Sequence, residues 1–153
     1  MRPMAKPKPK VFLDTSALIA GIASSKGAAR EILRLAEIGL IEAAVSRQVV
    51  VEADRNIAAK LPECLDDFRA YVGTLAPVLI EDPPAREVKR YSLLIDPGDA
   101  PILAAASAAK ADYLVTWDIK HFIAKGPRAL ARPKVMTPGE FLHEFRTLLD
   151  EGA

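Results

Sequence analysis

Four acidic side chains, spread over separate stretches of the sequence, stand where they could do chemistry. Asp14 ends the short apolar run in "VFLDTSALI", and Asp118 ends a second one in "YLVTWD". Asp99 stands just before an alanine-rich stretch, and Glu52 follows the three valines at 49–51. A charge at the end of an apolar run is costly unless something binds it. The sequence therefore raises the question of what these carboxylates bind.

A divalent cation is the ligand that these residue types favour. Carboxylates brought together repel one another and raise their own pKa values, and a bound cation removes that problem. The single cysteine, Cys64, excludes a cysteine-based zinc cluster. With two histidines in the chain, a metal ion would be held mainly by oxygen atoms. Oxygen ligands then indicate Mg²⁺ or Mn²⁺. Such a site can activate water and stabilise charge on a phosphoryl oxygen, which is the chemistry of phosphodiester hydrolysis.

Each acid alone has a simpler explanation, so the specificity lies in the set. A strand-end aspartate is commonly a turn residue, a helix-start aspartate is favoured by the dipole, and most glutamates are solvated. Asp96 precedes Pro97 in "DPGDA", which predicts a helix cap, so we leave it outside the site. The acids that remain form the predicted site: Asp14, Glu52, Asp99 and Asp118.

Basic and aromatic residues near these acids could contact a nucleic acid. We consider Arg47, Lys120, His121 and Lys125 as phosphate contacts, although ordinary surface charge explains each of them more simply. Trp117 could stack on a base, but packing against the protein is the interpretation that we favour.

The elements that must position these residues alternate between strand and helix. Short apolar runs predict strands, and helical spacing of apolar residues predicts helices between them. Ser46 suits a helix N-cap, and Thr137 with Glu140 forms a capping box. The pattern predicts one α/β domain with a central, mostly parallel sheet of about five strands and helices on both faces. The predicted strands are 11–13, 40–46, 78–80, 112–116 and 134–137, and the predicted helices are 28–38, 47–61, 62–75, 85–94, 100–110 and 138–149.

Length and composition agree with a single domain. The chain has 153 residues, 50% of them hydrophobic, which suits one core. Residues 1–10, rich in lysine and proline, are expected to form a flexible basic arm before a domain at 11–150. The net charge of +1 neither indicates nor excludes a nucleic-acid partner. With no apolar stretch of membrane length and no signal-peptide pattern, we expect a cytoplasmic protein without a membrane partner.

Four motifs give the chain a resemblance to the PIN domain family. They are "VFLDTSALI", "VSRQVVVEA", "DAPILAAASAAKADYLVTWDIKHF" and "KVMTPGEFL", and the resemblance covers nearly everything from residue 11 to 142. PIN domains are metal-dependent ribonucleases, and many small members are VapC-type toxins that a small antitoxin neutralises. The resemblance therefore implies an endoribonuclease, an RNA substrate, a cognate antitoxin of a type II pair and a homodimer.

The resemblance also assigns roles to residues. It implies that Asp14, Asp99 and Asp118 hold Mg²⁺ and that Glu52 completes the catalytic set or orients water. The hydroxyl-bearing positions that accompany these acids in the family match Ser16 and Thr116, which are expected to support the site.

Other functions are weighed against the same residues. A haloacid-dehalogenase-type phosphatase needs a second aspartate two residues after the first, where this chain has Ser16. A phospho-receiver module needs a mid-chain aspartate acceptor and a late strand-end lysine, and no convincing pair is present. The alternatives that stay open are a PIN-fold module that binds RNA or a partner without cleavage, and a housekeeping RNA-processing nuclease.

Overall fold

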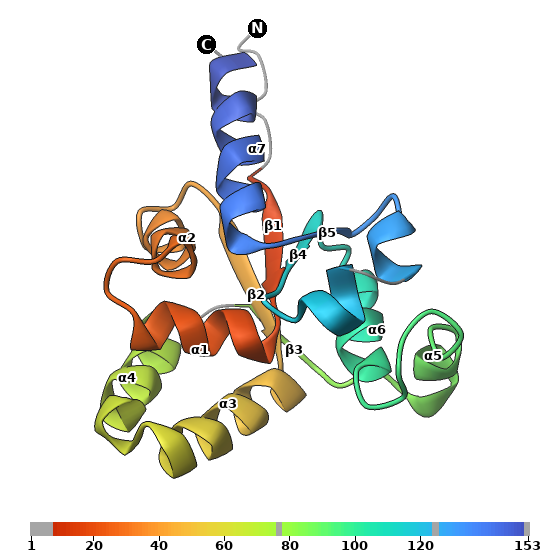
Figure 1. Ribbon diagram of the computed structural model, residues 1–153, viewed down its shortest axis with the longest axis horizontal. Coiled ribbons are helices and arrows are strands. Elements are labelled where there is room, and N and C mark those ends of the chain that lie inside the picture. The colour runs from red at the N-terminus through yellow and green to blue at the C-terminus, as the bar shows by residue number, and fades with distance from the viewer. Residues whose placement is uncertain (1–7, 76–77, 124–125, 152–153) are drawn as a thin grey trace, which may run out of the picture.

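A five-stranded parallel sheet forms the centre of the protein. The computed structural model describes residues 8–75, 78–123 and 126–151, so residues 1–7 of the predicted arm and Lys125 lie outside the described residues. The strand order is β3-β2-β1-β4-β5, and all four pairings are parallel (Figure 1). This confirms the predicted α/β class. The strands are β1 (Lys10–Leu13), β2 (Glu42–Ser46), β3 (Val78–Ile80), β4 (Tyr113–Val115) and β5 (Lys134–Met136).

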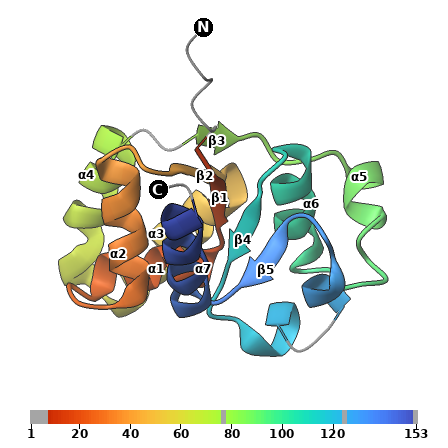
Figure 2. The same ribbon diagram turned by 90° about the horizontal axis from the view of Figure 1, so that it is seen from above.

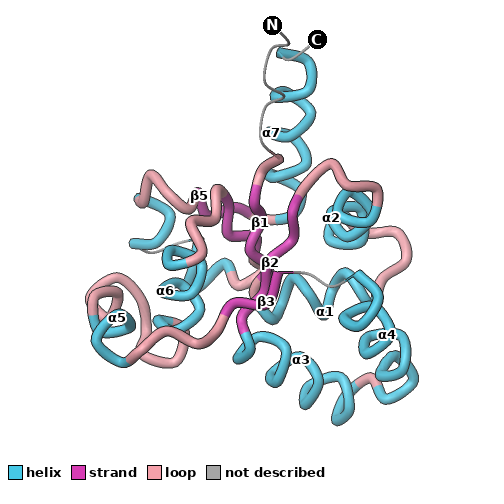
Figure 3. Tube along the Cα trace, turned by 180° about the vertical axis from the view of Figure 1, so that it is seen from behind, coloured by secondary structure: helices cyan, strands magenta, loops and turns pink. Residues whose placement is uncertain are grey.

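Helices cover both faces of the sheet, as the alternating pattern predicts. Figure 2 shows α1, α2 and α7 on one side and α5 with α6 on the other, and the view from behind in Figure 3 agrees. No described helix is long and apolar enough to cross a membrane. The helices are α1 (Thr15–Ala23), α2 (Ala28–Glu37), α3 (Arg47–Lys60), α4 (Leu65–Leu75), α5 (Ala85–Lys89), α6 (Ala100–Ala108) and α7 (Pro138–Glu151), with short helical turns η1 (Pro62–Cys64), η2 (Ile119–Ile123) and η3 (Gly126–Ala129).

The hydrophobic core fixes the two strands that carry the strand-end acids. Val11, Phe12 and Leu13 of β1 are buried, and so are all three residues of β4. Strands buried on both faces read as continuous apolar runs, which is why the sequence shows no alternation here. Four of the five alanines of α6 are buried as well, and their small side chains let this helix pack closely on the sheet. The carboxyl ends of β1 and β4 are therefore held side by side.

Two predicted helix starts are confirmed in atomic detail. Ser46 caps α3, because its Oγ accepts a hydrogen bond from Val49 N at 3.2 Å. Glu140 N donates to Thr137 Oγ1 at 3.3 Å, and Thr137 N donates to Glu140 Oε1 at 2.9 Å, which completes the capping box of α7. Both starts lie directly after a strand, so they set the direction in which each helix leaves the sheet.

Three details of the predicted elements are wrong or incomplete. No helix was predicted at 15–23, where α1 forms directly after Asp14. The helix predicted over 85–94 ends at Lys89, and turns continue the chain to residue 94. Asp96 does not cap the alanine-rich helix, because residues 97–99 form a turn and α6 begins at Ala100. This last correction frees the Asp96 carboxylate for other contacts.

Candidate functional site

A small cavity at the carboxyl edge of the sheet gathers the four predicted acids. Asp14, Glu52, Asp99 and Asp118 all line it, and its volume is about 280 Å³. They come from the end of β1, the body of α3, the start of α6 and the segment after β4. Ligands of open parallel sheets bind outside the carboxyl ends of the strands, which is where this cavity lies.

Asp14 is the most buried of these acids. Only 3% of the residue is exposed, and it is the N-cap of α1. Its Oδ1 accepts hydrogen bonds from Ser16 Oγ at 2.8 Å and Ala17 N at 2.9 Å, and its Oδ2 accepts one from Thr116 Oγ1. Burial raises the pKa of Asp14 to about 6, although the three hydrogen bonds work in the opposite direction. The carboxylate is therefore held in one orientation, but these neutral donors do not balance its negative charge.

The hydroxyls of Ser16 and Thr116 join the start of α1 to the segment after β4. Thr116 Oγ1 accepts a hydrogen bond from Asp118 N at 2.9 Å, and Ser16 Oγ accepts one from Trp117 N at 3.0 Å. Each hydroxyl thus donates to Asp14 and accepts from the backbone that carries Asp118. The two residues expected to support the site lie directly between these two acids.

Glu52 is oriented by two residues that sequence reasoning missed. Its Oε2 accepts a hydrogen bond from Thr15 Oγ1, and its Oε1 accepts one from Gln48 Nε2, both at 2.9 Å. Gln48 stands four residues before Glu52 on α3, a spacing at which helix side chains meet, so this contact could have been predicted. Nothing in the sequence links Thr15 to Glu52, because that contact depends on how α1 packs against α3.

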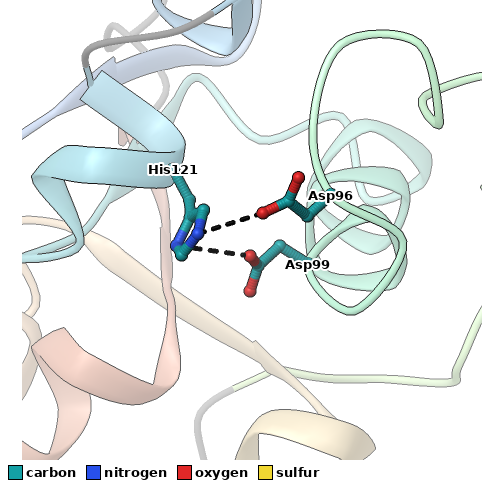
Figure 4. Close-up of side chains that lie close together, drawn as sticks. All are labelled: Asp96, Asp99 and His121. Carbon is teal, nitrogen blue, oxygen red and sulfur yellow. Dashed lines mark ion pairs between the residues drawn. The ribbon is translucent and has the colours of Figure 1, made fainter.

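His121 connects three aspartates, two of which, Asp99 and Asp118, line the cavity (Figure 4 shows Asp96 and Asp99). Its Nε2 lies 3.0 Å from Asp96 Oδ2, and its Nδ1 lies 3.0 Å from Asp118 Oδ2 and 3.7 Å from Asp99 Oδ2. Burial raises the pKa of Asp99, with the neighbouring carboxylates acting in the same direction and His121 opposing them. Sequence reasoning left Asp96 outside the site and considered His121 only as an RNA contact.

The other described residues considered as nucleic-acid contacts are not among those that line the cavity. Arg47 and Lys120 are exposed, and neither is among the described residues that line it. Trp117 is 44% exposed, so the protein covers somewhat more than half of it and leaves the rest open to solvent. Both interpretations, packing against the protein and stacking on a base, therefore stay predictions.

The chemistry of this donor set fits a divalent cation. The cavity presents carboxylate oxygens, and burial raises the pKa values of both Asp14 and Asp99. Carboxylate oxygens are the ligands that Mg²⁺ and Mn²⁺ prefer. Asp96, Asp99 and His121 can each place one ligand atom within 4.8 Å of the others. The predicted acids and this neighbouring group together form the candidate metal centre.

Comparison with known proteins identifies the family to which this fold belongs. A family model described as PIN domain matches residues 10–120. A toxin-antitoxin complex from Klebsiella pneumoniae is similar in structure, with a TM-score of 0.60, 23% identity and coverage of 84% of this chain and 97% of that one. A protein from Pyrobaculum aerophilum has a TM-score of 0.57 at 18% identity, covering 88% and 94%.

A third solved structure is VapBC2 from Rickettsia felis bound to a DNA fragment from its promoter. Its TM-score is 0.54 at 18% identity, and the match covers 83% of this chain and 96% of that one. A comparison with curated proteins finds no match. At these identities the three structures establish the fold, and the residues of the cavity must carry the argument about chemistry.

Proposed function

Because this chain belongs to the PIN domain family, we propose that it is a metal-dependent endoribonuclease that hydrolyses RNA phosphodiester bonds. The observation that carries the proposal is the convergence of four acids from four separate segments on one cavity at the carboxyl edge of the sheet. A binding module would not need this full set of carboxylates. The proposed catalytic residues are Asp14, Glu52, Asp99 and Asp118.

The proposal gives each side chain a task. Asp14, Asp99 and Asp118 would hold Mg²⁺ or Mn²⁺. When bound, such an ion supplies an activated water and stabilises charge on a phosphoryl oxygen. Ser16 and Thr116 keep the Asp14 carboxylate in one orientation through their hydroxyl hydrogen bonds.

Glu52 would orient the attacking water. Thr15 and Gln48 each donate to one of its carboxylate oxygens, so the plane of the group is fixed. Each oxygen keeps a second lone pair that can accept a hydrogen bond from water. A fixed acceptor of this kind contributes by holding the reacting water in one place.

The biological setting is also part of the proposal. One of the similar structures is a toxin-antitoxin complex and another is VapBC2 bound to promoter DNA, and this supports a role as the toxin of a type II pair. The partner would be a cognate antitoxin protein, the protein would act in the cytoplasm, and it would form a homodimer. Induced expression should then arrest growth, and Asp14→Asn should abolish the arrest. Cleavage without growth arrest would instead support a housekeeping RNA-processing nuclease.

The enzymatic proposal is tested by incubating the purified chain with a sequence-diverse pool of single-stranded RNA. We expect cuts with Mg²⁺ or Mn²⁺, no cuts with EDTA, and no cuts by Asp14→Asn in either condition. Asp67→Asn, which changes an exposed carboxylate on α4, is the matched control and should cleave normally. RNA binding that needs no metal and produces no cuts would contradict the proposal and support a binding module.

A further inference from the structure

We propose that His121 is a nitrogen ligand of the divalent cation at this site and that Asp96 fixes its ring. The site would then have mixed nitrogen and oxygen ligands and would favour Mn²⁺ over Mg²⁺. The inference rests on the proposed function in that both require a bound cation. It goes further by assigning a ligand that carboxylate motifs do not predict.

His121 Nδ1 lies at distances from two carboxylate oxygens that suit ligands of one ion. His121 Nδ1 lies 3.0 Å from Asp118 Oδ2 and 3.7 Å from Asp99 Oδ2. Ligand atoms held about 2.1 Å from one ion stand roughly 3 Å apart when they are adjacent in octahedral coordination. The two separations from Nδ1 are therefore close to those that shared coordination requires. The His121 side chain is 30% exposed, so an ion can reach it from solvent.

Asp96 gives the imidazole the orientation that a ligand needs. Its Oδ2 lies 3.0 Å from Nε2, whereas the oxygens of Asp99 and Asp118 pair with the other ring nitrogen, Nδ1. A histidine that binds a metal usually donates its other ring N–H to a carboxylate, which fixes the tautomer. With the proton on Nε2, the Nδ1 lone pair faces the two carboxylate oxygens. Lone pairs that face one another in this way repel, and a cation bound between them would remove that repulsion.

The backbone also holds Asp118 in the orientation that coordination needs. His121 N donates to Asp118 Oδ1 at 3.1 Å, so one carboxylate oxygen is occupied within the one-turn helix η2. Asp118 Oδ2 is the oxygen nearer to Nδ1, at 3.0 Å against 3.2 Å for Oδ1. The same short segment thus positions an oxygen ligand and a nitrogen ligand.

A different role for His121 would give the same contacts in the metal-free protein. A doubly protonated ring would pair directly with the three aspartates and act as a fixed positive charge. The two roles predict opposite effects of removing the ring. Loss of a ligand weakens metal binding, whereas loss of a competing cation strengthens it.

The nitrogen donor also predicts the metal preference. Mg²⁺ takes oxygen ligands and keeps several waters, while first-row transition metals accept imidazole readily. His121→Ala should therefore weaken Mn²⁺ binding more than Mg²⁺ binding. We expect a loss of about 10- to 100-fold for Mn²⁺ and a smaller loss for Mg²⁺, so the ratio of the two affinities falls.

The test uses the full chain and measures Mn²⁺ and Mg²⁺ binding by titration calorimetry. Asp96→Asn should weaken Mn²⁺ binding about tenfold, since outer carboxylates of metal-bound histidines have effects of this size. His143→Ala removes the other histidine, which is exposed on α7, and is the matched control with unchanged binding. Thermal unfolding in EDTA checks that each variant is folded.

A spectroscopic measurement on the wild-type protein tests the inference without any substitution. Pulsed electron paramagnetic resonance of the Mn²⁺-loaded wild-type protein should show coupling to a histidine nitrogen. Absence of that coupling, or Mn²⁺ binding that is unchanged or tighter in His121→Ala, would overturn the inference. If RNA cleavage still depends on the metal in that case, the proposed function survives alone. A wild-type chain that binds no Mn²⁺ would overturn both.

Discussion

Replacement of Asp14 by asparagine should stabilise the metal-free protein near neutral pH while it abolishes cleavage. The reason is that this carboxylate is 3% exposed and, among the described residues, its hydrogen-bond donors are all uncharged. Asparagine keeps the shape of the side chain and an oxygen acceptor for Ser16 Oγ and Ala17 N. It removes the buried charge, which is the unfavourable part of the interaction.

The size of the effect follows from the raised pKa of Asp14. Burial moves it from 3.8 to about 6. One pKa unit corresponds to about 1.4 kcal/mol, so ionisation of Asp14 lowers the free energy of unfolding by about 3 kcal/mol in total. The loss of the hydrogen bond from Thr116 offsets part of the gain, by about 1 kcal/mol. A net stabilisation of about 2 kcal/mol is expected at pH 8.

The pH dependence has a definite sign. Between pH 3.8 and about 6 the folded state binds more protons at Asp14 than the unfolded state does. The wild-type protein therefore loses stability relative to Asp14→Asn as the pH rises through this window, and the difference is constant above about pH 7. Roughly 2 kcal/mol of the change should develop between pH 4.5 and pH 8, where unfolding can be measured.

The assay is urea unfolding of both proteins in EDTA at a series of pH values. The difference between their free energies of unfolding isolates Asp14 from the other carboxyl groups. Asp54→Asn is a control of opposite sign, because the hydrogen bond from Arg69 lowers the pKa of Asp54. Excess Mn²⁺ should stabilise the wild type more than the variant. A difference that does not change with pH would refute the reasoning that burial dominates at Asp14.

Three further substitutions test, one at a time, the orientation of Asp14, the catalytic role of Glu52 and the stability of the fold. Thr116→Val removes the hydroxyl between Asp14 and Asp118, so cleavage should fall at least tenfold and the pKa of Asp14, read from unfolding, should rise further. Gln48→Met removes one donor to Glu52 and should lower the cleavage rate without changing Mn²⁺ affinity in calorimetry. Thr137→Ala breaks the capping box of α7 and should cost about 1 kcal/mol in urea unfolding, with normal cleavage. Normal cleavage by Thr116→Val, weaker Mn²⁺ binding by Gln48→Met, or unchanged stability of Thr137→Ala would contradict these expectations.

The parts of the site that could be predicted are those that follow directly from strand ends. Asp14 and Asp118 were predictable because parallel strands finish at a common edge, whatever the packing of the helices. The helix α1 was not predicted, since "TSALIAGIA" is apolar almost throughout and shows little helical periodicity. Asp14 at its N-cap was a usable signal, because aspartate is a preferred cap residue. The interpretation of Asp14 as a metal ligand obscured that second role.

The group around His121 could not be predicted from local patterns. Asp96 followed by proline has the local chemistry of a helix cap, and that signal was misleading. In the structure the Asp96 carbonyl oxygen, rather than its side chain, accepts the hydrogen bonds from Asp99 N and Ala100 N. The carboxylate is then free to meet His121, which stands on a helical turn 25 residues further along the chain. The contact between Asp96 and His121 depends on tertiary packing, so it cannot be predicted from the spacing of residues in the sequence.

The distribution of charge around the cavity explains why one end of it should hold the cation. Asp14 and Glu52 accept hydrogen bonds from hydroxyl, amide and backbone donors, which fix their orientation but leave their charges in place. No lysine or arginine is among the described residues that line the cavity. His121 is not one of the lining residues, but its ring lies beside two of them, Asp99 and Asp118, and beside Asp96, where it can carry a positive charge or offer a nitrogen ligand to a metal ion. A single proton leaves most of the carboxylate charge unbalanced, and a divalent cation bound through Nδ1 removes more of it at the point where three acids meet.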